Sequence, residues 1–313
     1  MDFYFNLLQS LATMLILIMI FLLLRKKSII QEEHRSLFGR LVTDFVLPVF
    51  IFTSFYQQKF DFSALKGALI FIIIIILSIL LAFAIGKLLK LENKQLGSFI
   101  LVSCFGSSAT LGYSIIAQVF PNNPHAVSDA VFMNEIGVGI LIFTLGVLIA
   151  NYFGKNEEVF TKSFIKSFFT NPIILSIILG IIFSFFLPKP TGLIANTLLG
   201  VLVIIGNSLI IFVAISIALM LRVFPLRSLL VLIVAVVSIE LILQPLIAFF
   251  FGQAVNLNQT DTEILLLETL VPSGTVAAVL ADRYGCDGSL ASNLVVATYL
   301  FSMITIPVVF SFI

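Results

Sequence analysis

Charged residues are scarce in this sequence. Only 11% of its 313 residues are Asp, Glu, Lys or Arg, whereas an average soluble domain carries about 25%. Hydrophobic residues make up 60%, and the mean hydropathy is +1.19. So few charges cannot cover the surface of a soluble protein of this length. We therefore expect an integral membrane protein without a separate soluble domain.

Cysteine and histidine are also rare, with two of each. Cys104 lies in an apolar run, Cys286 in a short polar loop, and both His34 and His125 in loops, so neither a disulfide nor a metal cluster is expected. The sequence has no H-E-x-x-H, G-x-G-D, G-x-S-x-G or Walker A motif. We expect no enzyme, no ATP-driven pump, no cofactor and no resident metal.

The sequence also has no marked excess of positive or negative charge. Lys and Arg number 17 against 16 Asp and Glu, and the longest basic run, Arg25-Lys26-Lys27, is too short to follow a phosphate backbone. Nucleic acid is therefore not an expected partner, and the lipid bilayer is the expected environment.

Long apolar segments make up most of the chain. A helix needs roughly 20 apolar residues to cross a bilayer, and a spanning segment must be helical because each backbone group needs an internal partner. We predict an all-α fold, and the first segment is expected to be kept because it lacks a signal-peptide cleavage pattern. The ten predicted spans are residues 3–24, 38–56, 62–89, 95–119, 126–153, 163–187, 193–221, 226–251, 262–283 and 288–312.

The basic residues predict the orientation of these spans. Lys59, Lys66 and Lys189 fall on one side of the membrane, and the other 14 Lys and Arg fall in the loops on the opposite side. Because basic loops face the cytoplasm, we predict a multi-pass plasma-membrane protein with both termini outside the cytoplasm.

Five spans in each half predict an inverted repeat, with residues 1–162 and 163–313 as its two members. In spans four and nine, the segment Phe105-Gly106-Ser107-Ser108-Ala109 matches Val271-Pro272-Ser273-Gly274-Thr275 in position. Gly costs about 1 kcal/mol and Pro about 3 kcal/mol inside a helix, so we predict that both helices are broken there and cross. The alternative is a simple kink at Pro272, with glycines that allow close helix packing.

Unwound backbone at membrane depth exposes N–H, C=O and hydroxyl groups that suit a small solute. The predicted solute-binding residues are Gly106, Ser107, Ser108, Thr110, Pro272, Ser273, Gly274 and Thr275.

Acidic and amide residues within the spans form a second group. The predicted ion-coupling residues are Asn134, Glu135, Glu240, Gln244 and Glu268. Because no Lys or Arg is left for a span interior, these carboxylates must be protonated or meet an external cation, so both a proton and sodium remain open. The alternative for Glu135 and Glu268 is a position near the membrane interface, where they reach water.

The chain resembles the auxin efflux carrier family, in particular its bacterial permease branch, and more distantly the bile acid sodium symporter fold. The resemblance rests on the ten spans, the two breaks, Leu47-Pro48, Asn171-Pro172 and the segment from Pro272 to Pro307. It implies a moving transport domain of spans three to five and eight to ten. Spans one, two, six and seven would form a scaffold that forms a homodimer.

This resemblance implies a secondary active transporter of small organic anions such as auxin, malate or malonate. We expect elevator-type alternating access coupled to protons or sodium. In many relatives the break in span four carries an Asn and often a later Pro, where this chain has Ser107 and Tyr113, and Ser273 stands where plant carriers have Asn. Glu240 stands where relatives often carry a basic residue, which makes a neutral or zwitterionic solute one alternative. A transporter-like membrane sensor is another.

Overall fold

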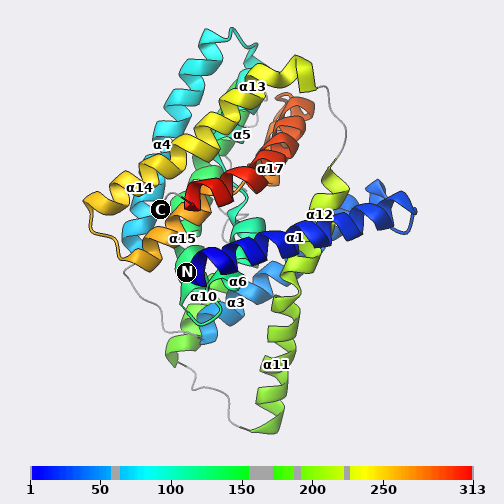
Figure 1. Ribbon diagram of the computed structural model, residues 1–313, viewed down its shortest axis with the longest axis vertical. Coiled ribbons are helices and arrows are strands. Elements are labelled where there is room, and N and C mark those ends of the chain that lie inside the picture. Colours follow the sequence, from blue (N-terminus) through cyan, green and yellow to red (C-terminus); the bar gives the residue numbers. More distant parts are fainter. Residues whose placement is uncertain are drawn as a thin grey trace. The chain divides into compact units, whose positions relative to one another are not determined.

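The computed structural model describes residues 2–57, 64–123, 125–154, 172–186, 192–221 and 226–311 (Figure 1). Helices account for the regular structure in these ranges, where β pairing is limited to one isolated bridge between Gly106 and Ser273. The all-α prediction is therefore confirmed for this part of the chain.

Seven helical segments within these ranges are long and apolar enough to cross a membrane. They are Tyr4–Lys26, Glu32–Gln57, Ala64–Leu88, Ala126–Gly154, Leu193–Met220, Leu229–Ala254 and Gly288–Phe310. The predicted spans 95–119 and 262–283 are each divided into shorter helices, and span 163–187 is described only as Pro172–Phe186. The total of ten spans and the repeat boundary at residues 162 and 163, which lies outside the described ranges, stay predictions.

The chain divides into two compact units, and each unit combines segments from both halves of the sequence. Unit 1 comprises Met1–Phe62, Ala109–Val131 and Lys162–Arg222. Its helices are α1 (Asp2–Lys26), α2 (Arg35–Leu41), α3 (Leu47–Gln57), α6 (Tyr113–Val119), α10 (Pro172–Phe186), α11 (Leu193–Asn207) and α12 (Leu209–Met220). Here α1 packs on α6 and α12, and α3 packs on α10 and α11.

Unit 2 comprises Ser63–Ser108, Phe132–Thr161 and Val223–Ile313. Its α-helices are α4 (Ala64–Leu88), α5 (Asn93–Cys104), α8 (Val147–Gly154), α13 (Leu226–Ser238), α14 (Gln244–Ala254), α15 (Gln259–Leu270), α16 (Thr275–Arg283) and α17 (Gly288–Phe310), while α7 (Ala126–Asn134) enters it from unit 1. The π-helical turns η4 (Glu135–Gly139), η5 (Ile142–Gly146) and η6 (Ile239–Leu243) join them.

Helix α5 lies at the centre of unit 2. Every residue from Leu96 to Cys104 is buried, because α5 contacts α4, α8, α13, α16 and α17. Helix α4 in turn lies beside α14 (Figure 1). The C-terminal end of α5 is thus held within the core of the unit.

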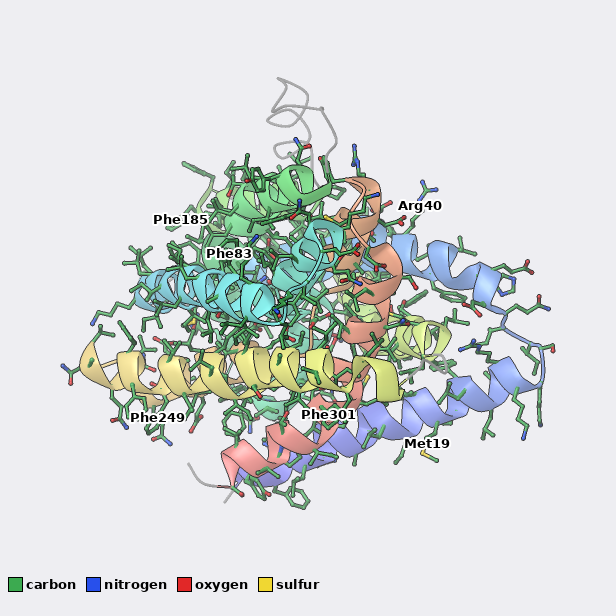
Figure 2. All side chains as sticks on the ribbon, turned by 90° about the horizontal axis from the view of Figure 1, so that it is seen from above. Met19, Arg40, Phe83, Phe185, Phe249 and Phe301 are labelled. Atoms are coloured by element: carbon green, nitrogen blue, oxygen red, sulfur yellow. The ribbon has the colours of Figure 1, made fainter. Side chains whose placement is uncertain are left out.

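Large apolar side chains are exposed on helices of both units. Met19 is 63% exposed, Phe185 61% and Phe301 39%, and all three are labelled in Figure 2. Such surfaces are stable against hydrocarbon, which solvates apolar side chains. The chain is accordingly a multi-pass membrane protein.

Cys286 lies in the connection between α16 and α17, outside the predicted spans. Its reactivity tests how this connection is packed. Its Sγ donates to the Ala150 carbonyl oxygen at 3.3 Å. Burial raises the pKa of the thiol to about 11; Lys94 opposes this shift and Asp287 adds to it.

Since the thiolate is the reactive form, we expect Cys286 to react with N-ethylmaleimide at pH 8 about a hundredfold more slowly in the folded protein than after unfolding in SDS. Mass spectrometry of the labelled peptide measures both rates, and Cys286→Ser identifies the signal. Equal rates before and after unfolding would show that this connection is not packed as described.

Candidate functional site

Both predicted interruptions coincide with ends of α-helix. Helix α5 ends at Cys104, and Phe105 is extended (φ −119°, ψ 103°) before the π-helical turn η3 (Ser108–Gly112). Helix α15 ends at Leu270, and Val271 (φ −66°, ψ 147°) and Gly274 (φ −71°, ψ 138°) are extended before α16. The backbone is therefore unwound at residues 105–107 and 271–274, which we call the first and second breaks.

The two breaks pair with each other inside unit 2. Gly106 lies opposite Ser273 in an antiparallel bridge. The Ser107 N–H donates to the Pro272 carbonyl oxygen, and the Gly274 N–H donates to the Phe105 carbonyl oxygen, both at 2.7 Å. Each break thus supplies partners that the other lost when its helix ended. We call this paired region the crossing.

Gly274 is required by the close approach of the two backbones. A Cβ atom at this position would lie 2.8 Å from the Gly106 carbonyl oxygen and 3.2 Å from that of Phe105. Both neighbours are backbone atoms that are already fixed by the crossing. A larger residue would therefore separate the breaks.

The second break is anchored by a buried polar group. The Ser273 hydroxyl donates to Glu240 Oε2 at 2.5 Å, and Thr298 Oγ1 donates to Ser273 Oγ at 3.1 Å. The Ser273 N–H in turn donates to Thr298 Oγ1 at 3.1 Å. All three side chains are fully buried. Glu240, predicted from sequence as an ion-coupling residue, thus contacts the crossing directly.

The first break has matching partners. Ser107 Oγ lies 2.7 Å from the Tyr299 hydroxyl, and either oxygen can donate. Gln244 Nε2 donates to the Ser103 carbonyl oxygen at 3.1 Å. This carbonyl lies in the last turn of α5, where intrahelical donors run out. Gln244 therefore supplies a donor at the end of the interrupted helix.

A second carboxylate group lies beside the start of η3. Glu268 of α15 is 1% exposed, and its polar neighbours are Ser108 and Glu135. Asn134 Nδ2 donates to Glu135 Oε1 at 3.1 Å. These residues are buried in unit 2. The structure thus brings together Asn134, Glu135 and Glu268, which are separated in sequence.

Three carboxylate oxygens in these groups have no hydrogen-bond partner among the described residues: Glu240 Oε1, Glu268 Oε1 and Glu268 Oε2. Within the same part of the chain, neither carboxylate forms an ion pair with a Lys, Arg or His. An unpaired buried charge is costly. The arrangement therefore suits a proton or a small external cation.

The remaining predicted site residues are placed as follows. Thr275 is the first residue of α16, half-buried next to Gly274. The side chain of Thr110 lies outside the described part of the structure. Thr298 and Tyr299 were missed by the sequence analysis, although two adjacent hydroxyl residues in an apolar span were an available signal.

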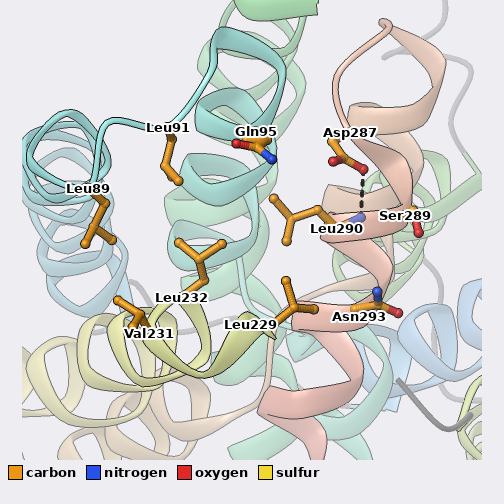
Figure 3. A pocket seen from close by; sticks show the side chains of 10 residues that line it. All are labelled: Leu89, Leu91, Gln95, Leu229, Val231, Leu232, Asp287, Ser289, Leu290 and Asn293. Carbon is orange, nitrogen blue, oxygen red and sulfur yellow. Dashed lines mark hydrogen bonds between the residues drawn. The ribbon is translucent and has the colours of Figure 1, made fainter. Parts of the chain in front are cut away.

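A separate cavity of about 420 Å³ lies elsewhere in unit 2, near the N-terminal ends of α5, α13 and α17 (Figure 3). Its polar lining consists of Gln95, Asp287, Ser289 and Asn293, and leucine and valine side chains form the rest. Asp287 Oδ1 accepts the Leu290 N–H at 2.9 Å as the cap of α17 (Figure 3). None of the predicted site residues lines this cavity.

An all-helical membrane chain with paired helix breaks and unpaired buried carboxylates has the construction of a membrane transporter. A family described as "Membrane transport protein" matches residues 7–310. The chain belongs to this family, the auxin efflux carrier family, as its sequence motifs indicated. It is a transporter and not an enzyme.

Two archaeal relatives match over most of their length. The chain is 26% identical over 282 residues to an uncharacterized transporter of Methanocaldococcus jannaschii, a match that covers 89% of each chain. It is 25% identical over 303 residues to an uncharacterized transporter of Methanothermobacter thermautotrophicus, and that match covers 96% of each chain.

We predict that Gly274→Ala destabilises the protein, because the new methyl group meets backbone oxygens that cannot move without opening the crossing. Overpacking of this kind costs about 1–3 kcal/mol. Thermal unfolding in detergent measures the loss. Gly200→Ala is the control, since a Cβ there meets no atom within 4 Å, and it should leave the unfolding temperature unchanged or raise it, because Ala favours a helix over Gly. Equal unfolding temperatures for both variants would contradict the close approach at Gly274.

Proposed function

We propose that this protein is a secondary active transporter that moves small organic anions, of the auxin, malate or malonate type, across the plasma membrane by elevator-type alternating access. The solute binds at the crossing. The observation that carries this proposal is the pairing of two unwound segments through Ser107, Pro272, Phe105 and Gly274.

The two half-helices that begin at the crossing suit an anion. Helix α16 starts at Thr275 directly after the second break, and η3 starts at Ser108 directly after the first. The first N–H groups of a helix lack intrahelical acceptors, and the helix dipole places partial positive charge there. A solute carboxylate can take up these donors without a Lys or Arg at membrane depth.

Glu268, Glu135 and Asn134 form the proposed ion-coupling group, with Ser108 beside them. This group supports coupling because the Glu268 carboxylate is buried and has no ion pair with a basic side chain among the described residues. Proximity to Ser108 links its charge to the start of η3, where the solute binds. Two other predicted coupling residues contact the same region: Glu240 accepts a hydrogen bond from Ser273, and Gln244 donates to the Ser103 carbonyl oxygen beside the crossing.

The composition of the two units supports an elevator mechanism. Unit 2 contains most of predicted spans three to five and eight to ten, whereas unit 1 contains spans one, two, six and seven together with Ala109–Val131. We propose unit 2 as the moving transport domain and unit 1 as the scaffold that forms a homodimer. Both termini would lie outside the cytoplasm.

Uptake by proteoliposomes tests this function. We expect accumulation of radiolabelled malate, malonate or indole-3-acetate when an inward proton or sodium gradient is imposed, and loss of accumulation when an ionophore removes that gradient. Binding of these acids without flux would favour the sensor. Gradient-driven uptake of an uncharged or zwitterionic solute, with none of these acids, would replace the proposed substrate class.

We further predict that Glu268→Gln abolishes gradient-driven accumulation but leaves exchange of solute down its own gradient. The amide has nearly the same shape as the carboxyl group but binds neither a proton nor a cation in the same way. Glu263→Gln, on the same helix and bonded to Gln259, is the matched control and should transport like wild type. Undiminished accumulation by Glu268→Gln would remove Glu268 from the coupling group.

A further inference from the structure

Two adjacent residues of α17, Thr298 and Tyr299, reach different breaks. Tyr299 lies 2.7 Å from Ser107 in the first break, and Thr298 forms hydrogen bonds with both the N–H and the hydroxyl of Ser273 in the second. We propose that this pair, which we call the α17 clamp, positions the crossing for solute binding. The inference rests on the proposed function, because it assigns the clamp's role to the same site.

Helix α17 is suited to hold the crossing because it is continuous where α5–η3 and α15–α16 are interrupted. It runs without a break over 23 residues, from Gly288 to Phe310, and packs against α5, α13 and α16. The clamp residues are themselves fixed, since Tyr299 is 3% exposed and Thr298 Oγ1 lies 2.8 Å from the Val295 carbonyl oxygen, an alternative acceptor for its single hydroxyl proton. A rigid helix therefore sets the distance between two segments that lack regular structure.

A second segment, formed by η6 and the start of α14, also contacts the second break and the end of α5. Glu240 accepts from the Ser273 hydroxyl, and Gln244, one turn later, donates to the Ser103 carbonyl oxygen. The η6–α14 segment therefore contacts the second break directly, and on the side of the first break it contacts the end of α5 just before the break. Loss of a single clamp bond should loosen one break without unfolding the unit.

The clamp also changes the expected role of the two serines. The Ser107 and Ser273 hydroxyls already have protein partners at hydrogen-bond distance, so they orient the unwound backbone. The solute is then recognised mainly by the main-chain N–H groups at the starts of η3 and α16, and the clamp fixes the orientation of these two helix starts. Disturbance of the clamp should weaken solute binding more than it slows translocation.

Three substitutions separate these effects: Tyr299→Phe removes one hydroxyl, Thr298→Val removes the other, and Thr298→Ser retains it. Uptake is measured with the acid among malate, malonate and indole-3-acetate that wild type accumulates fastest. One hydrogen bond is worth about 1 kcal/mol, so the half-saturation concentration should rise about fivefold in Tyr299→Phe, and by at least that factor in Thr298→Val, which removes both bonds to Ser273, with little change in maximal rate. Thr298→Ser should restore the wild-type value.

Hydrogen–deuterium exchange provides a readout that does not need transport. Tyr299→Phe should accelerate exchange in the peptide that contains residues 105–108, and Thr298→Val in the peptide that contains residues 271–274. Ser302→Ala is the control, because Ser302 donates within α17 to the Tyr299 carbonyl oxygen. It should change neither exchange nor uptake.

The inference is overturned if the clamp variants match Ser302→Ala in both readouts, or if each variant accelerates exchange equally in both breaks. If wild type takes up none of the three acids, the proposed function fails separately, and the exchange pattern alone decides whether the clamp positions the breaks.

Discussion

Backbone N–H and C=O groups that lack partners are strongly destabilising in hydrocarbon, and this constraint governs the centre of the molecule. Two helices end in the core of unit 2, at Cys104 and Leu270. Each would leave unpaired groups if it stood alone. The reciprocal bonds of Ser107 with Pro272 and of Gly274 with Phe105 give each break a partner in the other. The unwound segments are stable because they meet, and they meet only because residue 274 has no side chain.

The same constraint explains the polar side chains around the crossing. Glu240, Gln244, Thr298 and Tyr299 come from two continuous parts of unit 2 and bond to the interrupted helices or the breaks between them. Glu268 differs, because both of its oxygens lack a protein hydrogen bond in the described part of the chain. A side chain that hydrogen-bonds to the crossing stabilises it, whereas a carboxylate without a hydrogen-bond partner is available to an ion. This contrast separates the residues that stabilise the crossing from the proposed coupling group.

Much of this arrangement could be predicted from sequence. Gly106 and Pro272 predicted the two breaks because both residue types are unfavourable inside a helix. The acidic residues stood out as candidate ion-coupling residues because charge is so rare in the spans. The partner of Glu240 could not be predicted, since Ser273 is 33 residues away and only the packing of α15 against η6 brings them together. Thr298 and Tyr299 escaped notice for a similar reason: a hydroxyl in an apolar helix usually bonds to its own backbone. Thr298 does so, with Val295, and its bond to Ser273 depends on tertiary structure.

Disulfide trapping tests the pairing of the breaks most directly. Gly106 and Ser273 form a non-hydrogen-bonded antiparallel pair, flanked by the two backbone bonds. Such a pair has a Cα separation of about 4.5 Å, within the range that a disulfide spans. In a background carrying Cys104→Ala and Cys286→Ala, we expect Gly106→Cys with Ser273→Cys to form an intramolecular disulfide under mild oxidation, detected as a linked peptide by mass spectrometry. Free thiols at both positions in folded, oxidised protein would contradict the crossing.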